Sequence, residues 1–240
     1  MRLSQSLIVA SKDLAIIRRR RNLLYSTFII PYIVSLAFPL LIQSFVQGGA
    51  SISALSFILP AFSFFYLILA GLIPSAIASY SIIGEKVEKS LEPLLATPTT
   101  DGEILFGKGV AAILPSLAAI MSACVIFMGL TDAFTRNYFF PNLYSALDFF
   151  IVVPLGIVMS VEWSVLVSSR VSDVRIAQQI GSLLILPFAG LYVAGELGII
   201  QLSDTGTLLG ISGALALVDL FLFYVARALF RREQILTKWK

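Results

Sequence analysis

The stretch from Leu55 to Ile83 reads LSFILPAFSFFYLILAGLIPSAIASYSII and contains no charged residue. A helix needs about 20 apolar residues to cross the roughly 30 Å hydrocarbon core of a bilayer, and this stretch is longer than that. Pro60, Gly71 and Pro74 within it predict a tilted or kinked helix. Because backbone polar groups inside lipid must bond to one another, we interpret the stretch as a transmembrane helix.

Five other runs of the chain have the same character. They are Leu23–Val46, Val110–Leu130, Phe149–Val167, Leu183–Ile200 and Leu208–Ala228. Hydrophobic residues make up 58% of the 240 residues and charged residues 13%, whereas soluble domains average about 45–50% and about 25%. A water-soluble fold of this size could not bury so much apolar surface. We therefore expect an all-α integral membrane protein with six spans, located in the plasma membrane and in contact with its lipids.

The residues before the first span predict a helix that lies in the membrane interface. An apolar stripe at helical spacing is formed by Leu3, Leu7, Ala10, Leu14 and Ile17. Polar residues occupy the other face, which is typical of a helix at the boundary between lipid and water. We assign residues 1–22 to this interfacial helix. A short soluble helix packed on a partner is the alternative.

The positive charges indicate the orientation of the chain in the membrane. With six spans both termini share a side, and that side receives sixteen of the 17 Lys and Arg residues. Only Arg136 falls on the other side. Because cytoplasmic loops collect Lys and Arg, we expect both termini in the cytoplasm. The basic balance of the chain follows from this topology and does not indicate a nucleic-acid partner.

Several kinds of chemistry are excluded by composition. The chain has no histidine and a single cysteine, Cys124, so histidine-based catalysis, imidazole metal sites and two-cysteine metal sites are ruled out. The run Gly102–Lys108 fits the phosphate-loop pattern G-x-x-x-x-G-K. However, Gly109 stands where that motif needs Ser or Thr, and no α/β domain surrounds it. We therefore expect this chain to bind no nucleotide.

The loop after the second span carries the most informative polar stretch, GEKVEKSLEPLLATPTT, from Gly84 to Thr100. Its charged residues predict a short helix in water, and its leucines give that helix an apolar edge. Pro98 ends it. A helix that continues rigidly from a span is suited to docking on a cytoplasmic partner and to transmitting force. A plain solvated loop is the alternative.

This stretch resembles the signature of the type-2 permeases of ATP-binding cassette (ABC) exporters, approximately G-E-K-E-x-G-T-L-E-P-L-L-A-T-P. The runs Gly84–Lys86 and Leu91–Pro98 match it. The sequence departs from it at Val87, Lys89 and Ser90, and these changes leave the predicted helix intact. The second cytoplasmic loop, residues 168–181, also resembles the family.

The resemblance implies a single transmembrane permease domain over residues 1–240, with cytoplasmic loops at 84–108 and 168–181. Two copies, or this chain and a homologous permease, would enclose a path, and two ATP-binding subunits would press on the loops. The residues implied to contact these subunits are Glu85, Lys86, Glu88, Leu91, Glu92, Leu94, Leu95, Arg170 and Arg175. ATP and magnesium would be bound by the partner, so this chain would bind no cofactor and would not be an enzyme.

The substrate is left open, because lipids, drugs, peptides and sodium ions are all exported by this family. A membrane signalling or assembly scaffold that transports nothing is the alternative function. An intramembrane lipid-modifying enzyme is disfavoured, because the sequence offers neither histidine nor an acidic metal-binding constellation.

Three acidic residues lie within the predicted spans, namely Glu162, Glu196 and Asp219. Each costs about 2.5–3.5 kcal/mol at the centre of a membrane helix on insertion scales, so each should face protein or water. One interpretation is a path for a cation or polar substrate. The alternative is a hydrogen bond to a neighbouring helix or subunit, with the acid protonated.

Overall fold

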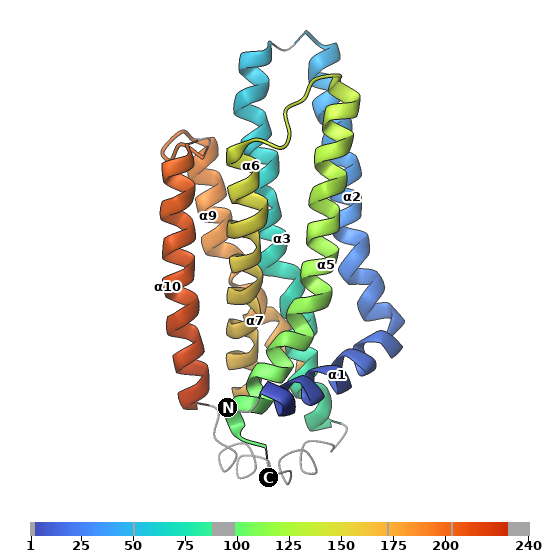
Figure 1. Cartoon of the computed structure of the whole chain (residues 1–240), viewed down its shortest axis with the longest axis vertical. Coiled ribbons are helices and arrows are strands. Elements are labelled where there is room, and N and C mark those ends of the chain that lie inside the picture. The colour runs from blue at the N-terminus through green and yellow to red at the C-terminus, as the bar shows by residue number, and fades with distance from the viewer. Residues whose placement is uncertain (1–2, 50, 88–98, 172, 203, 230–240) are drawn as a thin grey trace.

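The computed structural model of the chain describes residues 3–49, 51–87, 99–171, 173–202 and 204–229. Every regular element in these ranges is a helix, and most helices run along the long axis of the molecule (Figure 1). The elements are α1 (Leu3–Arg19), α2 (Arg21–Gln47), α3 (Ile52–Val87), α5 (Asp101–Thr135), α6 (Leu143–Leu147), η1 (Asp148–Val152), α7 (Val153–Arg170), α8 (Val174–Ser182), α9 (Ile185–Glu196) and α10 (Thr205–Leu229). Element η1 is a π-helix that joins α6 to α7.

Six segments of the described chain are long and apolar enough to cross a membrane, which confirms the six predicted spans. They are Arg21–Gln47, Ile58–Ser81, Asp101–Thr135, Leu143–Arg170, Val174–Gly195 and Thr205–Ala228. The fourth is built from α6, η1 and α7, and the fifth from α8 and α9. The all-helical membrane fold expected from composition is therefore correct.

Helix α3 lies at the centre of the bundle and contacts α7, α5, α8 and α9. In its most apolar window 67% of the residues are buried, against 22% for α2 and for α10. Phe64, Tyr66 and Leu67 on α3 are fully buried. Helices α2 and α10 instead turn a large apolar face outward, as expected for helices in contact with lipid.

Helix α1 lies across one end of the bundle (Figure 1) and packs mainly on α5. We call this the α1 end. The helix buries Val9, Ala10 and Ile17, but Leu7 is exposed. Its buried stripe is therefore rotated relative to the predicted one. The physical reason is that α1 carries apolar residues on two faces. One face packs on the bundle, while residues such as Leu7 face outward.

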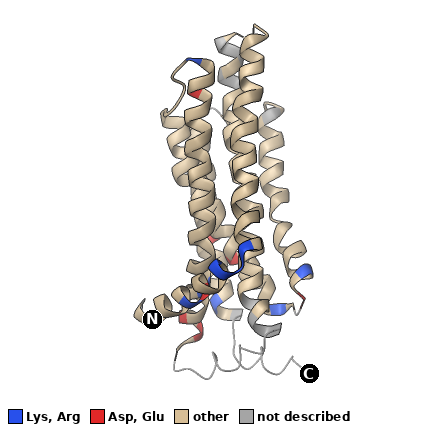
Figure 2. Cartoon of the chain, turned by 90° about the vertical axis from the view of Figure 1, so that its right-hand side faces the viewer, with Lys and Arg blue, Asp and Glu red and all other residues tan. Residues whose placement is uncertain are grey.

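Charged residues gather at the α1 end, and the long middle of the bundle carries few (Figure 2). The central ribbons in that view are almost free of Lys, Arg, Asp and Glu. Such a distribution is expected of a bundle whose middle lies in hydrocarbon, because an unpaired charge there is strongly unfavourable.

Candidate functional site

A buried polar cluster joins α1 to both helices that flank residues 88–98. Lys108 Nζ of α5 donates to Asp13 Oδ2 of α1 at 3.1 Å and to the carbonyl oxygen of Ser81 on α3 at 2.9 Å. The Ser81 hydroxyl donates to the same Asp13 oxygen at 2.6 Å. The Lys108 and Asp13 side chains are almost completely buried. Asp13 is therefore bonded at once to the helix that enters the 88–98 segment and to the helix that leaves it.

Local sequence explains why α5 starts early enough to carry Lys108 into this cluster. Thr100 and Glu103 form a capping box, in which the Glu103 amide donates to Thr100 Oγ1 and the Thr100 amide donates to Glu103 Oε2. Such reciprocal bonds satisfy amides that a helix start leaves unpaired. As a result α5 begins at Asp101, and residues 101–108 of the predicted loop region are helical.

A glycine lets α1 approach α5 closely at this point. A Cβ atom on Gly107 would lie 2.6 Å from the carbonyl oxygen of Ser6 and 2.8 Å from Cβ of Val9, both on α1. Any side chain at position 107 would therefore push the two helices apart. Gly107 precedes Lys108 directly, so the close approach and the ion pair belong to one contact between α1 and α5.

The predicted second loop is also partly helical. Arg170 is the last residue of α7 and is exposed. Asp173 caps α8 by accepting from the amide of Arg175, whose own side chain is exposed. Helix α8 packs on α3 and α7, and Trp163 Nε1 donates to the carbonyl oxygen of Ile180. The two arginines therefore flank a short connection that is fixed to the central helices.

The other residues predicted to contact a partner lie in or next to the first loop. Glu85 and Lys86 belong to the last turn of α3. The remaining five lie outside the described residues, and they are Glu88, Leu91, Glu92, Leu94 and Leu95.

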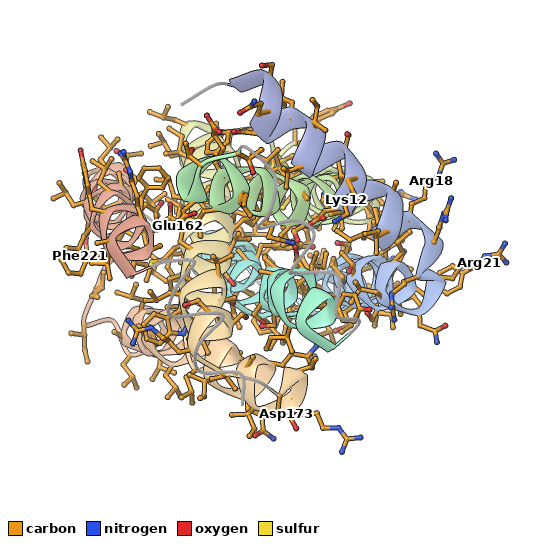
Figure 3. The ribbon with its side chains drawn as sticks, turned by 90° about the horizontal axis from the view of Figure 1, so that it is seen from below. Lys12, Arg18, Arg21, Glu162, Asp173 and Phe221 are labelled. Carbon is orange, nitrogen blue, oxygen red and sulfur yellow. The ribbon has the colours of Figure 1, made fainter. Side chains whose placement is uncertain are left out.

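Two of the three predicted membrane acids are brought together. Glu162 lies on α7 and Asp219 on α10, two helices that pack against each other, and Figure 3 shows Glu162 between these helices. Both Asp219 oxygens and Glu162 Oε2 are buried without a hydrogen-bond partner in the described chain. Glu196 is the last residue of α9 and belongs to a different helix.

Asp148, at the start of η1, is a buried acid that sequence inspection missed. It is fully buried, and neither carboxylate oxygen has a hydrogen-bond partner among the described residues. Ser63 and Tyr144 are among its polar neighbours. An acidic residue directly before the apolar run Phe149–Val153 was the signal that could have identified it.

The polar cluster and the buried acids thus lie on a six-span bundle, and comparison with known proteins identifies its family. Residues 7–225 match the family model described as ABC-2 family transporter protein. The chain belongs to this family. This ABC-2 family member is accordingly a multi-pass cell membrane protein.

A relative supports the same assignment. The ABC-2 chain is 27% identical over 222 residues to the ABC transporter permease protein NatB of Bacillus subtilis (strain 168). The match covers 78% of this chain and 56% of NatB, so the chain spans little more than half the length of that relative.

Proposed function

We propose that this permease exports its substrate and that its α1 end is the cytoplasmic docking surface for two ATP-binding subunits. A second copy of the chain, or a homologous permease, completes the path. The first loop, residues 84–108, is the main coupling contact, and the second loop, residues 168–181, is an additional one. The gathering of charge at the α1 end supports this orientation, because cytoplasmic segments collect Lys and Arg.

The observation that carries the proposal is the bonding of Asp13 to both Ser81 and Lys108. Ser81 lies near the end of α3, and Lys108 lies near the start of α5. A force applied between these helices is therefore shared with α1. Helix α3 in turn packs on α7 and α8, so a tilt of α3 is transmitted to the second loop.

ATP-driven closure of the partner subunits then biases the permease pair between two arrangements. A partner shifts such an equilibrium only by its differential affinity for the two states, so the docking surface must differ between them. Rigid attachment of α1, α3 and α5 to one another makes the α1 end move as a body. This is the property that a coupling surface needs.

Glu162 and Asp219 are the strongest candidates in this chain for a polar lining of the path. They lie on two helices that pack against each other, α7 and α10, and have buried oxygens without protein donors in the described chain. A cation, a protonated amine or a shared proton would satisfy them. Glu196 is retained as a third candidate near the other end of the spans.

The proposal is tested by reconstitution of the purified permease with and without its ATP-binding subunit. We expect no ATP hydrolysis by the permease alone, and hydrolysis with ATP-dependent transport by the complex. Inside-out vesicles should accumulate an exported substrate when ATP is added outside. The matched control uses a partner subunit with a substitution that blocks hydrolysis. A complex that hydrolyses ATP but moves no member of a panel of lipids, drugs, peptides and ions would favour the scaffold.

A further inference from the structure

An open hollow of about 640 Å³ lies at the junction between α1 and α2. Helix α1 ends at Arg19 and α2 begins at Arg21, while Arg20 between them has a non-helical backbone with φ −91° and ψ 79°. The polar residues that line the hollow are Arg19, Arg20, Arg21, Asn22, Ser26 and Tyr80. Three consecutive arginines therefore line one concave surface.

The chemistry of this hollow matches a phosphate group. None of the described residues that line it is acidic, and the first turn of α2 contains no acidic residue. Arginine binds phosphate through paired N–H groups held in a fixed plane. The guanidinium of Arg20 stacks on the Tyr80 ring, with 4.4 Å between Cζ and the ring centroid. Arg18 and Arg21 extend outward from the ribbon at the same corner of the molecule (Figure 3).

The surface next to the hollow identifies the rest of the ligand. Arg21 lies on the same face of α2 as Tyr25, Ile29 and Ile33, which follow it at intervals of one helical turn. These three side chains are all exposed although α2 is a membrane span. A cationic hollow thus continues directly into an apolar strip that runs into the membrane. A phospholipid has this same order of charge and apolar chain.

We propose that the α1–α2 junction binds an anionic phospholipid, with the headgroup phosphate among Arg19, Arg20 and Arg21 and an acyl chain along Tyr25, Ile29 and Ile33. Free phosphate would satisfy the arginines but would leave the apolar strip unused. Anionic lipids are concentrated in the cytoplasmic leaflet, which agrees with the proposed orientation. The lipid site itself requires only that α2 spans the membrane.

Tyr80 connects the lipid site to the end of α3, where the first loop begins. A Cβ atom on Gly84 would lie 2.9 Å from Cζ of Tyr80, so the tyrosine ring covers this glycine at the end of α3. A headgroup that holds Arg20 against Tyr80 would therefore stabilise the attachment of the α1–α2 junction to the helix that enters the loop.

The test is a lipid titration of the purified full-length chain, with bound lipid counted by native mass spectrometry. Phosphatidylglycerol is compared with phosphatidylcholine of the same acyl chains. The wild type should prefer phosphatidylglycerol, and Arg19→Gln with Arg21→Gln should weaken its binding on the order of tenfold, because each Arg near an anionic surface contributes appreciably. The matched control, Arg170→Gln with Arg175→Gln, removes two exposed arginines outside the hollow and should leave the preference unchanged.

Three outcomes would overturn the proposal. The first is an equal loss of phosphatidylglycerol binding in both double variants, and the second is unchanged binding in the junction variant. The third is displacement of phosphatidylglycerol by millimolar inorganic phosphate at constant ionic strength. If the junction variant does not fold, Asn22→Asp provides the second test, because it adds a negative charge to the hollow without changing side-chain size. It should lower phosphatidylglycerol binding, and unchanged binding would contradict the site.

Discussion

Lys108 of α5 and Asp13 of α1 form an ion pair across 3.1 Å, with both side chains almost fully removed from solvent. The pair joins residues 95 positions apart in the sequence. Removing one partner of a buried pair leaves an uncompensated charge and costs about 3–5 kcal/mol. The pair therefore adds to the apolar packing that holds α1 on the bundle, and loss of either group alone should be destabilising.

A double-mutant cycle should reveal this dependence. We expect Asp13→Val and Lys108→Met to lower the free energy of unfolding by about 3 kcal/mol each, and the double variant to lose clearly less than the sum. Equilibrium unfolding in mixed micelles gives the free energy of unfolding of the wild type, the two single variants and the double variant. Lys12→Met is the control, because Lys12 is exposed and exposed ion pairs contribute about 0–1 kcal/mol. Additive losses would mean that the two groups are not energetically coupled.

The close approach of α1 to α5 at Gly107 gives a second expectation. Gly107→Ala should destabilise the protein by about 1–3 kcal/mol, because the new Cβ meets the backbone of Ser6. Gly129→Ala in the same helix meets no atom of the described residues within 4 Å and should be neutral or slightly stabilising. Thermal unfolding of the two variants compares them directly. Equal midpoints would argue against the packing described at Gly107.

The paired carboxyls of Glu162 and Asp219 should respond non-additively to neutralisation. Asp219→Asn keeps the size of the side chain and removes one of two like charges, so we expect assembly and stability to be retained. Once one acid is neutral, Glu162→Gln should add little further stability. Stability, assembly and substrate-stimulated ATP hydrolysis should be measured on one preparation. Loss of transport with intact assembly would assign the pair to the path, whereas retained transport would assign it to helix packing.

Cysteine labelling tests the orientation on which the docking surface depends. In a Cys124→Ala background, Asn137→Cys should react with an impermeant reagent from outside the cell, because it adjoins Arg136 at the end far from α1. Arg175→Cys should react only after the cytoplasmic side is made accessible. Both original residues are exposed, so access to the reagent depends on the membrane side. The reverse pattern would invert the assignment.

Hydropathy predicted the six spans because lipid requires long apolar helices, and this requirement leaves a strong local signal. The predicted third span began at Val110, because hydropathy detects only the apolar part of a helix. Helix α5 in fact begins at Asp101. The capping pattern of Thr100 and Glu103 was present in the sequence and could have located that boundary.

Contacts between distant residues could not be predicted from the same signals. Periodicity in α1 showed apolar positions but could not decide which face meets α5 and which meets lipid. Asp13 was therefore not identified as a candidate. Its burial depends on Gly107, which lets α1 approach α5, and on Lys108, which pairs with it. Similarly, the sequence identified Glu162 and Asp219 as costly in a membrane, but their proximity depends on how α10 packs against α7.

The central claim is that the first loop docks the ATP-binding subunit, and Leu94→Ala with Leu95→Ala tests it most directly. Truncating an apolar anchor at a docking centre often costs about 2 kcal/mol or more, which is about 30-fold in affinity. Binding of the ATP-binding subunit to the purified permease should fall by about that factor. Membrane insertion should be unchanged because no span is altered, and Glu92→Lys should impair coupling more than the same reversal at Glu233. Normal binding and normal transport by the double alanine variant would contradict the account.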